Sequence, residues 1–200
     1  PKFQAEYPGI RLQLAEHTST RLEESVLSGD VDLIIATQPV DEDAFSFAEL
    51  YSEEMVLVLP ANHELSKKYH LPQDCHGTLP LLPIGLLKDT PFIQMHSEQK
   101  LHQQLLSLCA EAGFVPQIYL QTRSMETALT LASAGLGATL LPMTLLRAFQ
   151  PETRPCYAAL PTRPRRHALV AWRKKAYLSH AARAFIDLLV NYCRDKGDRV

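Results

Sequence analysis

RSMETALTLASAGLGATLLP, running from Arg123 to Pro142, indicates the fold class of this chain most directly. Apolar residues recur at helical spacing through its first half, which predicts a helix with one face toward a core. Gly135 and Gly137 then provide a helix stop and a tight turn. The apolar residues that follow predict a short buried strand, which Pro142 ends. A helix, glycines and a strand in this order are typical of an α/β protein.

Strand and helix patterns alternate through the rest of the chain as well. Residues 10–16 alternate apolar and polar side chains, which predicts a strand with one buried face. The nearly continuous apolar run over 31–36 predicts a parallel strand covered on both faces. Repeated strand–helix–strand units favour parallel sheets with helices on both sides. Further strands are predicted over 45–50, 54–59, 92–95, 115–121, 156–160 and 167–172, and helices over 3–7, 20–28, 98–112, 125–134 and 180–194.

Two strand–helix series predict two subdomains rather than one continuous sheet. The signals weaken near Ala61 and again over the proline-rich residues 154–164, which are the natural crossings between the two series. The last helix should therefore return to the first subdomain. We expect residues 1–60 and 161–200 to form subdomain I and residues 61–160 to form subdomain II.

Composition excludes several classes of protein. A hydrophobic fraction of 46% and a charged fraction of 21% are ordinary for a globular protein and argue against disorder. A formal charge of −2 gives no general attraction for nucleic acid or an anionic membrane. No apolar run approaches the roughly 20 residues that span a bilayer, and the first residues resemble no signal peptide. We therefore expect no membrane partner.

Catalytic, metal and cofactor motifs are not found. The eight histidines never take the HExxH form, and the four cysteines never form a CxxC pair. A serine nucleophile would need a GxSxG elbow, which the sequence does not contain. The glycines at 135 and 137 follow a helix, whereas a dinucleotide loop follows a strand. We predict that the protein is not an enzyme and uses neither a metal nor a cofactor.

Several sequence segments, taken in order, resemble the effector-binding domain of LysR-type transcriptional regulators. They are FQAEYPGIRLQL, SGDVDLIIA, MVLVLPANHEL, TPFIQM and EAGFVPQIYLQTRSMETALTLASAGLGATLLP, so the resemblance runs from Phe3 to about Trp172. It implies two Rossmann-like subdomains joined by two crossing strands, an α/β fold like that of type 2 periplasmic binding proteins. It further implies that a small-molecule effector binds in the cleft between the subdomains.

The resemblance also implies a cytoplasmic homodimer or tetramer. Helix 3–7 of one subunit would pack against helix 125–134 of another, although both could serve only their own core. DNA would be contacted only through an N-terminal winged helix-turn-helix, which these residues do not include. The alternatives are a periplasmic-type solute-binding protein of a transport system, which needs an export signal upstream, and an enzyme on the same fold.

Polar residues follow the carboxyl ends of the predicted strands. In open α/β sheets a ligand lies beyond these ends, where helix N-termini present free N–H groups. Among these residues, Arg123 could pair with a carboxylate, and His96 could be a ligand contact or a pH-sensitive group. The alternative is that Ser19, Ser97 and Ser124 only cap helices. The candidate effector-binding residues are Thr18, Ser19, Thr37, Gln94, His96, Thr122, Arg123 and Ser124.

Overall fold

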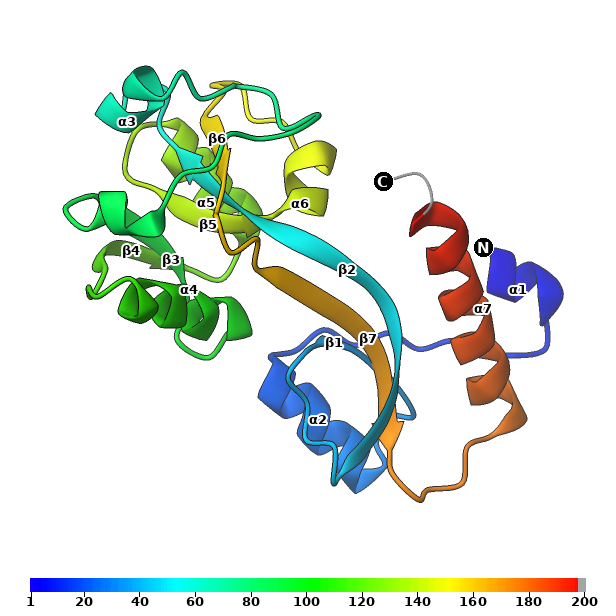
Figure 1. Cartoon of the computed structure of the whole chain (residues 1–200). Helices are drawn as coiled ribbons and strands as arrows, with labels where there is room; N and C mark the ends of the chain where they lie inside the picture. Colours follow the sequence, from blue (N-terminus) through cyan, green and yellow to red (C-terminus); the bar gives the residue numbers. More distant parts are fainter. Residues whose placement is uncertain (198–200) are drawn as a thin grey trace. The chain divides into compact units, whose positions relative to one another are not determined.

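The computed structural model describes residues 1–197, which form two compact units (Figure 1). Unit 1 comprises Pro1–Ser52 and the chain from His167 onward, and unit 2 comprises Glu53–Arg166. The divisions fall within two long strands, β2 (Phe45–Leu59) and β7 (Arg165–Arg173). No helix among the described residues is both long enough and apolar enough to cross a bilayer.

Unit 2 is built on strands of both directions. Strands β3 (Pro91–Met95) and β4 (Gln117–Thr122) pair in parallel. Strands β5 (Thr139–Pro142) and β6 (Cys156–Ala159) pair antiparallel with the second half of β2. Two helices pack against β3, namely α4 (Lys100–Glu111) and α5 (Met125–Ser133) (Figure 1). The remaining elements of unit 2 are α3 (Glu64–Lys68), a 3-10 turn η1 (Ile84–Leu87) and α6 (Met143–Ala148), none of which the sequence patterns predicted.

The segment over residues 123–142 folds as predicted, into α5, a glycine turn and β5. Gly137 lies so close to β3 that a Cβ built on it would be 2.5 Å from the carbonyl oxygen of Pro91. Its neighbour Ala138 donates its N–H to that same oxygen at 2.8 Å and accepts from the N–H of Ile93 at 2.8 Å. Ala138, just before β5, can therefore form a parallel bridge with Phe92 of β3 because position 137 has no side chain.

Unit 1 has its core on both faces of β7. Strand β1 (Ile34–Thr37) pairs antiparallel with β7, whose successive side chains point to opposite faces. Leu169 and Ala171 pack with α2 (Ser19–Ser28), and Val170 packs with α7 (His180–Gly197). The short helix α1 (Lys2–Glu6) lies beside α7 (Figure 1), where the rings of Phe3 and Phe185 meet edge to face at 5.0 Å.

Two predictions for unit 1 were wrong. Residues 10–16 form no strand: Leu12 and Leu14 are 41% and 93% exposed, and within residues 1–197 no strand pairs with them. Residues 31–36 were predicted to be a buried parallel strand, but β1 begins at Ile34 and is antiparallel to its partner. β1 is at the edge of the sheet, and Ile35 is 58% exposed, so the strand is not covered on both faces. Alternation and apolar runs describe one strand and carry no information on which strand lies next to it.

Candidate functional site

Five of the predicted site residues lie together in unit 2, where β3 and β4 end side by side. Met95, the last residue of β3, stands opposite Thr122, the last residue of β4. Beyond these ends, the N–H of His96 donates to the carbonyl of Thr122 at 2.9 Å. The two chains then turn into α4 and α5. The residues brought together at this edge are Gln94, His96, Thr122, Arg123 and Ser124.

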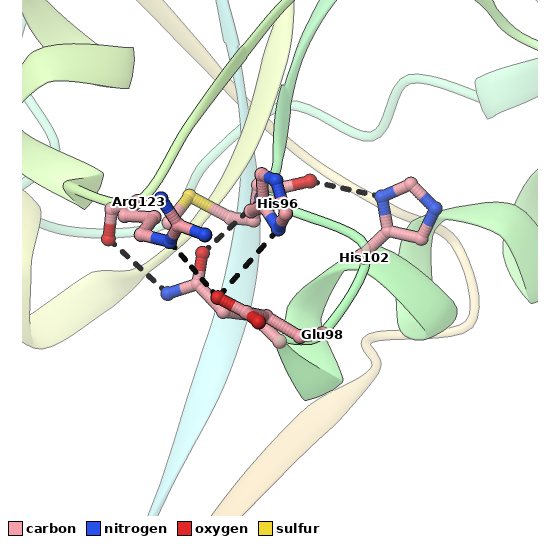
Figure 2. Close-up of polar contacts among 6 residues, drawn as sticks. His96, Glu98, His102 and Arg123 are labelled. Atoms are coloured by element: carbon pink, nitrogen blue, oxygen red, sulfur yellow. Dashed lines mark hydrogen bonds and ion pairs between the residues drawn. The ribbon is translucent and has the colours of Figure 1, made fainter. Parts of the chain in front are cut away.

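The side chain of Gln94 serves the interior of unit 2. Gln94 is only 3% exposed, its Oε1 accepts from the N–H of Met95 at 2.9 Å, and its Nε2 donates to the carbonyl of His102 at 3.2 Å. The ring of His102 completes the link, with its Nδ1 2.9 Å from the carbonyl oxygen of Met95 (Figure 2). The amide of Gln94 therefore fastens α4 to β3.

The hydroxyls of Thr122 and Ser124 shape the start of α5. Ser124 is its N-cap, since Ser124 Oγ accepts from the N–H of Thr127 at 3.2 Å. Thr122 Oγ1 accepts from the N–H of Ser124 at 3.1 Å. The capping interpretation is thus confirmed for Ser124. Each hydroxyl also carries its own O–H donor, which these contacts do not use.

Arg123 and His96 share a carboxylate that the sequence patterns did not single out. Arg123 Nε donates to Oε1 of Glu98 at 2.9 Å, and His96 Nδ1 lies 3.6 Å from the same oxygen (Figure 2). The hydrogen bond from Arg123, with the charges of Arg123 and His96, lowers the pKa of Glu98. Glu98 follows His96 by two positions in the same turn. Its closeness in sequence to this predicted site residue was the signal by which it could have been found.

Gln99 joins the two turns and corrects the prediction for Ser97. Its Oε1 accepts from the N–H of His96 at 3.1 Å, and its Nε2 donates to the carbonyl of Arg123 at 3.1 Å. Because residues 96–99 are held in this turn, α4 begins only at Lys100, with Gln99 as its N-cap residue. Ser97 therefore caps no helix.

The other three candidates belong to unit 1. Thr18 is the N-cap residue of α2 without a side-chain cap hydrogen bond, and Ser19 is the first residue of that helix. Thr37 is the last residue of β1, opposite Ala168 of β7. All three are half-buried. Their part in binding stays a prediction.

A buried ion pair contacts Met125, the first residue of α5. Arg166 Nε and Nη2 donate to Oε1 of Glu53 at 2.9 and 2.5 Å, and Arg166 Nη1 lies 3.8 Å from the sulfur of Met125. Oε2 of Glu53 accepts from the N–H of Thr144 at 3.3 Å and from its hydroxyl. The side chains of Glu53 and Arg166 are 3% and 17% exposed. Both carboxylate oxygens are therefore satisfied inside unit 2.

The described residues contain no cluster of candidate metal ligands, and three of the four cysteines are buried. No group of three or more His, Cys, Asp or Glu residues in the described part of the chain could hold a metal ion. Burial raises the pKa of the Cys109 thiol to about 11 and also raises the pKa values of Cys75 and Cys156. Thiols of this kind are predominantly protonated at neutral pH, whereas reactive cysteines need a lowered pKa.

The family model of the LysR substrate binding domain matches residues 1–194. Two relatives from Bacillus subtilis (strain 168), the uncharacterized HTH-type transcriptional regulators YcgK and YwbI, are 30% and 31% identical over 94% and 96% of this chain. The alignments cover 59% and 60% of those proteins, so the chain spans about three-fifths of the relatives that it matches. Both relatives are named as transcriptional regulators.

Solved structures share the fold. The regulatory domain of Synechocystis PCC6803 CcmR in complex with 2-PG matches with a TM-score of 0.82, 19% identity and coverage of 97% of this chain and 88% of that chain. The effector binding domain of QuiR in complex with shikimate matches with a TM-score of 0.79 and 20% identity, over 97% of this chain and 88% of that chain. The BenM effector binding domain with its effector benzoate matches with a TM-score of 0.76 and 19% identity, over 98% of this chain and 84% of that chain.

The predicted fold class, an α/β domain of the periplasmic-binding-protein type, is confirmed by these structures. The resemblance of the sequence segments is likewise confirmed by a family match that extends over nearly the whole chain. The chain belongs to the family of LysR substrate-binding domains.

Proposed function

We propose that this chain binds a small organic acid at the β3–β4 edge of unit 2 and passes the signal to a DNA-binding region elsewhere in the same regulator. The observation that carries the proposal is the position of Arg123 beyond the end of β4, beside the first turn of α5. A guanidinium has five N–H donors in a planar fork that matches a carboxylate. The hydroxyls of Thr122 and Ser124 add short-range donors at the same place.

The ligands of structural neighbours support an acid as the effector. Shikimate, in the QuiR structure, and benzoate, in the BenM structure, both carry one carboxylate at neutral pH. The helix N-terminus at Ser124 also favours negative charge. Binding of DNA, a place in the cytoplasm and the choice of target genes are proposed for the whole regulator, on the basis of relatives named HTH-type regulators.

Replacing Arg123 by alanine tests this site. We expect the affinity for the acid to fall about tenfold or more, because a hydrogen bond to a charged group contributes about 1.5–3 kcal/mol. Organic acids, shikimate and benzoate among them, would be screened by thermal shift on the wild-type protein, and calorimetry would then compare the variants. Arg183→Ala removes the same charge from an exposed position of α7 and should leave the affinity unchanged. Equal affinity in Arg123→Ala and wild type contradicts the site.

We also propose self-association, through the exposed edge of β4. The main apolar side chains of the two helices predicted for this role pack within their own units: Phe3 is 4% exposed, and Ala128, Leu129 and Ala132 of α5 are fully buried. Strand β4, in contrast, exposes large apolar side chains. Such an edge favours pairing with another chain. The exposed fractions are 37% for Ile118, 60% for Tyr119 and 39% for Leu120.

A charge on this strand should weaken self-association. We expect Tyr119→Lys to raise the dissociation constant of the dimer at least tenfold, measured by sedimentation equilibrium, because it places an ammonium group in a buried apolar contact. Tyr177→Lys is the matched control, since Tyr177 is 86% exposed on unit 1. An unchanged dissociation constant for Tyr119→Lys, or the same weakening by both variants, contradicts the assignment to β4.

A further inference from the structure

We propose that Glu98 is an internal competitor of the effector: its carboxylate occupies Arg123 until an anionic ligand displaces it. The proposal rests on the proposed anion site at Arg123. It assigns to Glu98 the role of setting which ligands bind, since only a group that interacts with the guanidinium better than this carboxylate can take its place.

One carboxylate oxygen faces both basic groups of the site. Oε1 of Glu98 accepts from Arg123 Nε at 2.9 Å and lies 3.6 Å from His96 Nδ1 (Figure 2). The pKa of Glu98 is lowered, chiefly by the hydrogen bond from Arg123, so the carboxylate is ionised at neutral pH. Without a ligand, the positive charge of Arg123 is therefore balanced from within the protein.

The two turns that carry Glu98 and Arg123 are connected by hydrogen bonds that do not depend on the Glu98–Arg123 ion pair. The N–H of His96 donates to the carbonyl of Thr122, and the side chain of Gln99 bridges the backbones of His96 and Arg123. These bonds involve backbone atoms and the Gln99 amide only. The Glu98 side chain can therefore leave Arg123 while both turns keep their geometry.

The ring of His96 has an unpaired nitrogen with which a bound ligand could form a hydrogen bond. Its Nδ1 is buried and has no hydrogen-bond partner among the described residues, because 3.6 Å from Glu98 is too long for a hydrogen bond. Buried polar atoms in native proteins are normally paired, so an unpaired one beside an arginine needs an explanation. A ligand carboxylate could accept from Arg123 with one oxygen and meet Nδ1 with the other.

The ion pair is weak enough to be displaced. The side chains of Arg123 and Glu98 are 67% and 36% exposed, and ion pairs at such positions change an equilibrium by about fivefold at most. Competition by Glu98 should therefore reduce the affinity for a carboxylate by a few-fold without preventing binding. Neutral analogues of the effector have no charge with which to displace Glu98.

Acetate can test this competition directly. The Arg123 Nε–H signal would be followed by NMR in the isotopically labelled protein, with its assignment checked by loss of the signal in Arg123→Lys. Acetate would replace chloride at constant ionic strength. We expect Glu98→Gln to lower the acetate dissociation constant at this signal about threefold to fivefold. Glu126→Gln, which removes a charge from the first turn of α5, is the matched control and should change the constant less than twofold.

Two results would overturn the proposal. Equal or weaker acetate binding in Glu98→Gln would mean that Glu98 orients Arg123 instead of competing for it. An equal gain in Glu98→Gln and Glu126→Gln would mean that only the general loss of negative charge matters. Because acetate is the probe, this experiment is independent of the effector screen, and failure of the proposed function would be seen instead as unchanged effector affinity in Arg123→Ala.

Discussion

Gly137→Ala is expected to destabilise unit 2 by about 3 kcal/mol, because overpacking against a fixed neighbour costs roughly this much. The new Cβ would lie 2.5 Å from the carbonyl oxygen and 3.1 Å from the carbonyl carbon of Pro91. Neither strand can move apart freely, since Ala138 exchanges two 2.8 Å hydrogen bonds with Pro91 and Ile93. Urea unfolding followed by circular dichroism measures the loss.

Gly85→Ala is the matched control for this experiment. A Cβ at position 85 would meet its nearest atoms at 3.9 Å, an ordinary van der Waals distance, so the expected change is within about 0.5 kcal/mol. Gly135→Ala measures the cost of a positive φ without a close contact. Gly135 has a φ of 95°, and a Cβ there would have only the side chain of Asn62 nearby, at 4.0 Å. If Gly137→Ala unfolds at the same urea concentration as Gly85→Ala, the close approach to β3 is not what requires glycine.

The sequence predicted the elements whose signals are local. The segment over 123–142 is an example, because helical spacing, two glycines and an apolar run all act between near neighbours. The same holds for β2, whose two predicted parts join into one strand. The partner of a strand is a different matter. β1 pairs with β7 from near the end of the chain, and nothing in residues 31–36 specifies that neighbour or its direction.

The candidate site divides in the same way. Strand ends and helix starts brought Thr122, Arg123 and Ser124 to the predicted place, since parallel strands end at one edge of a sheet. The partner Glu98 escaped prediction because it is 25 positions from Arg123 in the chain. Gln94 was predicted to be a ligand contact, but a side chain at a strand end can point into the core as easily as out of it. The structure uses its amide inside unit 2.

Glu53→Ala is expected to destabilise unit 2 by about 3–5 kcal/mol, the usual cost of leaving one partner of a buried ion pair alone. The change would strand the guanidinium of Arg166, which is 17% exposed, and both donors of Thr144. Glu54→Ala is the matched control. Glu54 is the next residue on β2, and its ion pair with Arg163 is 3.1 Å long and more exposed, at 18% and 49%, so its loss should cost at most about 1 kcal/mol. Equal losses in the two variants would contradict the special role of the buried pair.

A double replacement separates stability from position. Glu53→Met combined with Arg166→Met removes both charges, and such exchanges of a buried ion pair for apolar side chains are often neutral or stabilising. We therefore expect the double variant to regain most of the stability that Glu53→Ala loses. The pair contacts Met125, the residue after the Ser124 cap, so it lies against the first turn of α5. A stable double variant could still show a shifted Arg123 Nε–H signal and weaker acetate binding at Arg123. That result would mean that the pair holds the first turn of α5 in the position that the anion site requires.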